Sequence, residues 1–175
     1  MPIPLVMTII SPDRTGLVES VARVVAEHGG NWLESRMCRL GGEFAGILRI
    51  EIPAAKKSAL LDALQKLQAN GLQILVRADQ PVSAAASGRQ TQLEIVGSDR
   101  PGIVREITAA LARAGVNVEE FFSEVVSAPM SGETLFKATA RLHLPERCDL
   151  AALKKDLEKI ATDLLVDVSF AELAN

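Results

Sequence analysis

The chain has 175 residues, of which 48% are hydrophobic and 23% charged, and its formal net charge is −3. This composition is typical of a globular protein and too apolar for a disordered one. The acidic balance argues against a broad phosphate-binding surface, and an aromatic content of 3% argues against a platform on which single-stranded nucleic acid could stack. The composition therefore predicts no direct contact with nucleic acid.

The first half of the chain predicts one strand–helix–strand–strand–helix–strand unit. Short apolar runs indicate strands, helical spacing of apolar residues indicates helices, and strict alternation indicates a strand with one covered face. In order, these are a strand at 5–10, a helix with an apolar face at Leu17, Val18, Val21, Val24, Val25 and His28, a strand pair that includes 44–52, a helix marked by Leu60, Leu64 and Leu67, and a strand at 72–76.

The second half predicts the same succession of elements. They are a strand at 93–96, a helix with an apolar face at Ile103, Val104, Ile107, Leu111 and Ala114, a strand pair that includes the alternating residues 136–144, a helix marked by Leu153, Leu157 and Ile160, and a strand at 164–168. Gly29–Gly30 and Gly115 end the first helix of each half, where a left-handed residue is favoured.

The two halves are copies of one domain. Residues 7–18 recur as 93–104, and the second half carries six extra residues between Phe121 and Glu133. The small-residue stretch between the copies is typical of a linker. We therefore predict a first domain at 1–80, a linker at 81–91 and a second domain at 92–175.

Each copy predicts a ferredoxin-like βαββαβ unit of the α+β class, in which two helices cover one face of a four-stranded antiparallel sheet. A unit of this size buries only about 60–65% of the surface of its unfolded chain. Pairing of units would cover the remaining apolar surface. The pattern leaves open whether the pairing occurs in a two-domain monomer or in a homodimer.

The first strand–helix junction of each copy is the most informative segment for function. Asp13, Arg14 and Gly16 lie where one helix begins, and Asp99, Arg100 and Gly102 lie at the equivalent place in the other copy. Free backbone N–H groups and the helix dipole favour an anion there, such as the carboxylate of an amino acid.

Two asparagines follow the first helix of each copy. Asn31 and Asn117 lie after a glycine turn, at the start of the next predicted strand. An amide side chain offers both a donor and an acceptor, which suits a zwitterion. A purely structural interpretation is also open: Asp13 and Asp99 would cap their helices, and the two asparagines would hold turns.

The other reactive side chains predict neither an enzyme nor a metal site. Cys38 and Cys148 have no metal-ligand spacing, and His28 and His143 have no nucleophile or metal partner in the sequence. Lys154–Lys155 lie among polar neighbours and are typical of a solvated helix face. We expect no cofactor. No apolar run approaches the ~20 residues that cross a bilayer, and the N-terminus lacks the pattern of a signal peptide, so we expect a cytoplasmic protein without membrane contact.

The repeated motif Asp-Arg-x-Gly-[Leu/Ile]-Val, the apolar helix and the Gly-x-Asn turn resemble the ACT domain, a small amino-acid-sensing module. The whole chain resembles the tandem-ACT glycine cleavage system transcriptional repressor family, most specifically at 31–37 and 42–45. The resemblance implies an amino acid at a paired-domain interface, near the first strand–helix loop. It assigns this role to Asp13, Arg14, Gly16, Asn31, Asp99, Arg100, Gly102 and Asn117.

This resemblance implies a regulator that is not an enzyme. The protein would be a transcriptional (co)repressor of glycine cleavage genes. It would bind a small amino acid, with glycine as the first candidate, and act through a partner, a DNA-binding transcription factor. The alternative is a free-standing regulatory subunit of a metabolic enzyme. The second copy departs from the first after Asn117, so equivalence of the two sites is not implied.

Overall fold

The computed structural model describes residues 1–79, 87–128 and 132–172. The chain divides into two compact units, Met1–Pro81 and Val82–Asn175, which we call unit 1 and unit 2. In the described part of the chain, no helix is both long and apolar enough to span a bilayer.

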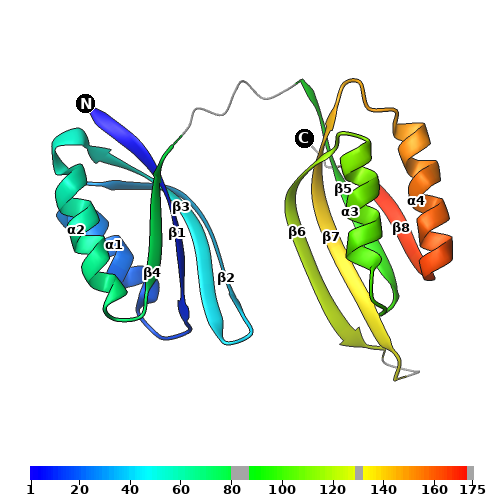
Figure 1. Cartoon of the computed structure of the whole chain (residues 1–175), viewed down its shortest axis with the longest axis horizontal. Coiled ribbons are helices and arrows are strands. Elements are labelled where there is room, and N and C mark those ends of the chain that lie inside the picture. The colour runs from blue at the N-terminus through cyan, green and yellow to red at the C-terminus, as the bar shows by residue number, and fades with distance from the viewer. Residues whose placement is uncertain (80–86, 129–131, 173–175) are drawn as a thin grey trace. The chain divides into compact units, whose positions relative to one another are not determined.

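Unit 1 is a four-stranded antiparallel sheet with two helices on one face (Figure 1). Its sheet has the strand order β2-β3-β1-β4. Its elements are β1 (Pro2–Pro12), α1 (Leu17–Glu27), β2 (Asn31–Leu40), β3 (Glu43–Pro53), α2 (Lys57–Gln68) and β4 (Gln73–Ala78), with a 3-10 turn at Ala54–Lys56 before α2.

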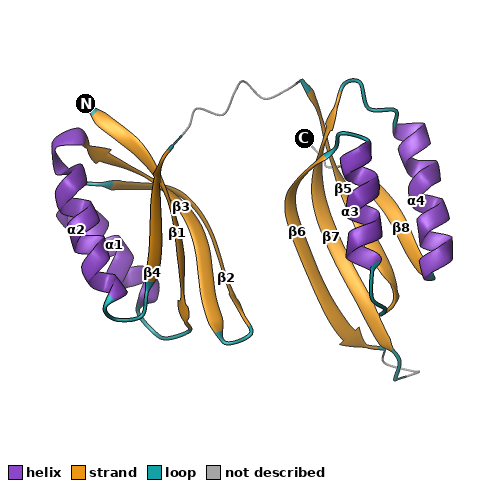
Figure 2. Ribbon diagram, in the orientation of Figure 1, coloured by secondary structure: helices purple, strands orange, loops and turns teal. Residues whose placement is uncertain are grey.

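Unit 2 repeats this architecture (Figure 2). Its sheet has the order β6-β7-β5-β8, again antiparallel. Its elements are β5 (Gly88–Ser98), α3 (Ile103–Arg113), β6 (Asn117–Ser127), β7 (Thr134–Pro145), α4 (Leu150–Leu164) and β8 (Val166–Glu172). The predicted α+β class and the ferredoxin-like βαββαβ order of both copies are confirmed.

Each unit has its own apolar core between the helices and the covered face of the sheet. The core of unit 1 includes Leu5, Met7, Ile9, Val21, Leu48, Ile50 and Leu60, and that of unit 2 includes Leu93, Ile95, Ile107, Ala140, Leu142 and Leu157. On β3 the buried residues alternate with exposed Ile47 and Arg49. Side chains on a strand point to opposite faces in turn, so this alternation leaves the second face of the sheet open.

The outer strands β2 and β6 each contain one extra residue, Leu33 and Glu119, at a β-bulge. The bulge turns the rest of the strand over relative to its beginning. As a result Trp32 and Met37 both pack against the core, although they are an odd number of residues apart.

Two predicted helix residues are not on the covered face. Val18 and Val104 are 42% and 40% exposed. Each directly follows a buried residue, Leu17 or Ile103, and lies at the edge of the apolar stripe. Helical spacing identifies the stripe but not how far around the helix the sheet covers it.

Two predicted boundaries differ from the structure. Helix α4 continues to Leu164, so the strand predicted at 164–168 begins only at Val166. The strand β5 begins at Gly88, so residues 88–91 of the predicted linker pair with β7. Residues 80–86 lie outside the described part of the chain.

Leu165 joins α4 to β8 in a left-handed conformation, with φ 55. In unit 1 the residue before the buried Leu72 is Gly71, with φ 84. A left-handed conformation costs a residue with a Cβ about 1–2 kcal/mol, whereas glycine adopts it freely. The second copy therefore carries a strained residue at a position where the first copy has glycine.

We predict that Leu165→Gly raises the free energy of unfolding by up to about 1 kcal/mol, since relief of strain exceeds the added entropy of the unfolded chain. Little burial is lost because Leu165 is 63% exposed. Urea unfolding followed by circular dichroism measures the change. Leu165→Ala keeps a Cβ and is expected to give no such gain; a lower stability for Leu165→Gly would contradict the strain.

Candidate functional site

The candidate loops connect β1 to α1 and β5 to α3. Gly16 and Gly102 occupy the N-cap positions in the left-handed region, with φ 89 and 99. A Cβ built on either glycine meets no atom within 4 Å, so the backbone conformation rather than crowding favours glycine. No side chain caps α1 or α3. Asp13 and Asp99 therefore do not act as helix caps, which corrects that part of the structural interpretation.

In unit 1 both charged side chains of the loop have protein partners. Asp13 Oδ2 lies 2.7 Å from Arg39 Nε, and the Asp13 backbone N–H donates to the Gly42 carbonyl at 2.8 Å. Arg14 Nη2 donates to the Asn70 carbonyl, also at 2.8 Å. These contacts tie the loop to the β2–β3 hairpin and to the connection between α2 and β4.

In unit 2 the same loop is held by its backbone alone. The Asp99 N–H donates to the Thr134 carbonyl at 3.0 Å. Among residues 87–128 and 132–172, no ion pair reaches Asp99 and no hydrogen bond involves the Arg100 side chain. The position that Arg39 holds in β2 is occupied by Val125 in β6, opposite Phe136 as Arg39 is opposite Phe44. The second loop thus keeps an unpaired carboxylate and an unpaired guanidinium.

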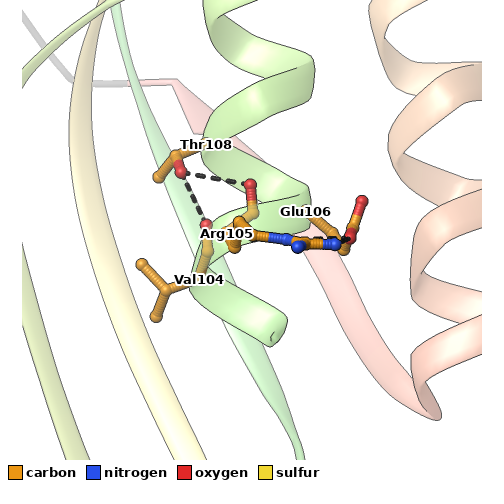
Figure 3. A network of polar contacts seen from close by, with 4 residues as sticks. All are labelled: Val104, Arg105, Glu106 and Thr108. Atoms are coloured by element: carbon orange, nitrogen blue, oxygen red, sulfur yellow. Dashed lines mark hydrogen bonds and ion pairs between the residues drawn. The ribbon is translucent and has the colours of Figure 1, made fainter. Parts of the chain in front are cut away.

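The first turn of α3 neutralises its own charges. Arg105 Nη2 and Glu106 Oε1 are 2.5 Å apart, and the Thr108 hydroxyl donates to the Val104 carbonyl at 2.7 Å (Figure 3). The Arg105 guanidinium lowers the pKa of the Glu106 carboxyl, and Glu106 raises the pKa of Arg105 in turn. Because this pair is self-contained, the local charge that a ligand meets at the loop comes from Asp99, Arg100 and the helix N–H groups.

Asn31 and Asn117 do not join these loops within their own units. Asn31 is opposite Glu51, which is opposite Pro4, eight residues before the end of β1. At a rise of about 3.3 Å per residue, Asn31 and the Asp13 loop are roughly 26 Å apart along the sheet. Asn117 has the same relation to Asp99, through His143 and Gln90. The structure therefore brings together Asp, Arg and Gly of each loop and separates the asparagine from them.

The remaining reactive side chains have structural surroundings. His28 Nδ1 lies 2.7 Å from the Val24 carbonyl at the end of α1, as expected for an imidazole at a helix C-terminus. His143 Nδ1 is 4.0 Å from Glu119 on the neighbouring strand. Cys38 and Cys148 are free thiols. Within the described residues, no group of three or more His, Cys, Asp or Glu side chains is arranged to hold a metal ion.

Sequence reasoning missed the partners of the unit 1 loop. Arg39 belongs to an outer strand, and the Asn70 carbonyl lies 56 residues from Arg14. The closest available signal was the difference between the copies, since Arg39 is replaced by Val125 where Asp13 is kept as Asp99.

Similarity to known proteins falls into the same two parts of the chain. The ACT domain model matches residues 4–77 and again residues 90–171. The glycine cleavage system transcriptional repressors of Escherichia coli (strain K12) and Shigella flexneri are each 24% identical over 167 residues, which cover 91% of this chain and 85% of theirs.

Two solved structures resemble the whole chain. A protein of unknown function from Galdieria sulphuraria is 30% identical, with a TM-score of 0.85 over 99% of this chain and 100% of that one. A candidate glycine cleavage system transcriptional repressor is 20% identical, with a TM-score of 0.69 over 100% of this chain and 99% of that one. The second likeness concerns the fold alone.

Proposed function

The chain belongs to the ACT-domain family and is related to the glycine cleavage system transcriptional repressors; from this premise we propose that it is a regulator, not an enzyme, that responds to a small amino acid. Glycine is the first candidate effector. We further propose that the protein acts on transcription through a DNA-binding partner rather than by touching DNA itself.

The observation that carries this proposal is the chemistry of the unit 2 loop. A zwitterion presents a carboxylate and an ammonium group a short distance apart. Arg100 and the free N–H groups at the start of α3 suit the carboxylate, and the unpaired Asp99 carboxylate suits the ammonium group. Gly102 leaves the backbone uncovered beside them, so that a small ligand can approach.

The unit 1 loop offers the same groups, but the ligand has to displace protein contacts to use them. An ammonium group that pairs with the Asp13 carboxylate replaces Arg39 in that ion pair. A ligand carboxylate that binds Arg14 replaces the Asn70 carbonyl as its hydrogen-bond acceptor. An effector shifts a population of states only by its difference in affinity for them. Exchange of these partners supplies such a difference, because β2 and the α2–β4 connection lose their contacts with the loop when the ligand binds.

Isothermal titration of the full chain with glycine, serine and other small amino acids tests the effector. We expect saturable heat with at least one of them, and a loss of about tenfold or more in affinity for Asp99→Ala and for Arg100→Ala, because a hydrogen bond to a charged group is worth about 1.5–3 kcal/mol. Asp156→Ala removes an exposed carboxylate on α4 and serves as the matched control. No heat with any amino acid, or unchanged affinity in both loop variants, would count against the effector site.

Affinity purification of the full chain from its own cells, followed by identification of the bound proteins, tests the partner. A DNA-binding regulator whose capture changes with the effector is the expected result. Reproducible capture of a metabolic enzyme in its place would favour the alternative of a regulatory subunit.

A further inference from the structure

A hollow of about 290 Å³ lies in unit 2, where β5 and α4 begin and β7 and β8 end. Its walls include Arg89, Thr91, Leu144, Leu150, Lys154 and Phe170. Arg89 lies at the start of β5 and the Asp99 loop follows the end of that strand, roughly 30 Å away at about 3.3 Å per residue. The hollow is therefore separate from the loop assigned to the effector.

Two cationic side chains, Arg89 and Lys154, line this hollow. Lys154 Nζ lies 5.5 Å from the centre of the Phe170 ring, a cation–π contact that holds the ammonium group in place. Across the parts of the chain that the structure describes, neither Arg89 nor Lys154 forms an ion pair with a carboxylate. Leu144 is buried, and Leu150 and Phe170 pack against the core.

The first copy of the domain shows that the fold does not require these cations. In the repeat, Arg89 corresponds to Ile3, opposite Ile52 as Arg89 is opposite Leu144. Lys154 follows the buried Leu153 as Leu61 follows the buried Leu60. Unit 1 thus has aliphatic side chains at both of these positions, and its cation at this end is Lys57, the counterpart of Leu150.

Thr91 is a third position at which an aliphatic residue of unit 1 is replaced by a polar residue in unit 2. It is buried on β5, its hydroxyl donates to the Ala171 carbonyl at 3.0 Å, and its counterpart on β1 is the buried Leu5. Three positions that are aliphatic in unit 1 are therefore polar or cationic in unit 2, and all three line one hollow. A hollow that gains two unpaired cations beside Leu150 and the Phe170 ring is suited to bind an anion with a small apolar body.

We propose that the hollow formed by Arg89, Lys154 and Phe170 binds a small organic anion, in which one oxyanion group meets the two cations and an aliphatic body contacts Leu150 and Phe170. The volume suits a ligand smaller than a typical drug molecule, since pockets for those occupy about 300–1,000 Å³. An amino acid is disfavoured because its ammonium group would lie beside two positive charges. A monocarboxylate that lacks the ammonium group, such as a branched 2-oxo acid, fits this chemistry.

Titration calorimetry of the full chain tests the proposal with three probes: 4-methyl-2-oxopentanoate, inorganic phosphate and leucine. We expect saturable binding of the 2-oxo acid, weaker binding of leucine, and phosphate binding only if the oxyanion alone suffices. Arg89→Ile and Lys154→Leu introduce the residues that unit 1 carries, so both variants are expected to fold. Each should weaken binding of the 2-oxo acid by about tenfold or more, as expected for loss of a charge-assisted contact.

Lys155→Leu is the matched control, because it removes the neighbouring cation, which does not line the hollow. The proposal would be overturned if Lys155→Leu weakened binding equally, or if the Arg89→Ile/Lys154→Leu double variant bound the 2-oxo acid fully. It would also be overturned if leucine bound as tightly as its 2-oxo acid, or if neither the 2-oxo acid nor phosphate gave heat. Titration of the same variants with glycine distinguishes the two sites, because the affinity of these variants for the loop effector should not change.

Discussion

Ile50→Ala is expected to lower the free energy of unfolding of unit 1 by about 2–5 kcal/mol. Ile50 is 0% exposed and lies in the middle of β3, between Leu5 on β1 and Trp32 on β2. Truncation to alanine removes the free energy gained by burying the rest of the isoleucine side chain, and it leaves a cavity between the sheet and the helices. A unit of about 80 residues has only about 4–12 kcal/mol of stability, so the loss is a large share of the total.

Denaturant unfolding followed by fluorescence measures this change, because the single tryptophan of the chain, Trp32, lies in unit 1. Ile47→Ala is the control on the same strand: Ile47 is 48% exposed on the opposite face, and its truncation should cost under about 1 kcal/mol. Leu142→Ala, the counterpart of Ile50 in unit 2, should destabilise that unit to a similar extent, as followed by circular dichroism. Equal costs for Ile47→Ala and Ile50→Ala would contradict the assignment of the covered face.

Gly97→Ala should cost unit 2 about 3 kcal/mol, the upper part of the range for overpacking in a well-packed site. A Cβ on Gly97 would lie 2.5 Å from Val166 Cα and 2.6 Å from the Leu165 carbonyl oxygen. Both atoms are backbone, so relief requires β8 to move away from β5. Chemical denaturation of the two forms measures the difference.

Substitutions at two other glycines provide reference values for this prediction. A Cβ on Gly46 would lie 2.5 Å from Met37 Cγ and 3.0 Å from the Arg36 carbonyl oxygen. Its backbone contact is longer than those at Gly97, so we expect a smaller cost, about 1–2 kcal/mol. A Cβ on Gly16 would meet no atom within 4 Å, but alanine would have to adopt φ near 89. This left-handed conformation is expected to lower the free energy of unfolding by about 1 kcal/mol. A Gly97→Ala variant that is no less stable than these two would show that β5 and β8 are not as closely paired as described.

The fold was predictable because both of its signals are local. Alternation at 136–144 and helical spacing around Val21 each follow from contact with one covered face, and the repeat supplied every such signal twice. The signals failed at Val18 and Val104, at the edge of the apolar stripe of each helix, and at Leu165, where an apolar residue occupies a turn position that ordinarily takes glycine. Such failures depend on how a helix is seated against its neighbours and on the backbone conformation of a turn, which no short window of sequence contains.

The candidate sites were predictable to a smaller extent. The order Asp-Arg-x-Gly placed the loop groups together because they are adjacent in the chain. The partners Arg39 and Asn70 come from distant elements, and Asn31 lies at the other end of the sheet. Lys154 read alone was typical of a solvated helix face; only the fold places it beside Arg89 and Phe170. Which groups meet is decided by strand register and by how the helices pack on the sheet, and both are properties of distant segments.

The bulges at Leu33 and Glu119 limit how this chain can change in length during evolution. Adding or removing one residue there would exchange the inward and outward side chains of the rest of the strand, and so expose Met37 in unit 1. The six extra residues of the second copy fall instead in the segment that connects β6 and β7. Both copies carry their extra residue at the same place in the outer strand, whereas the connections between the paired strands differ in length.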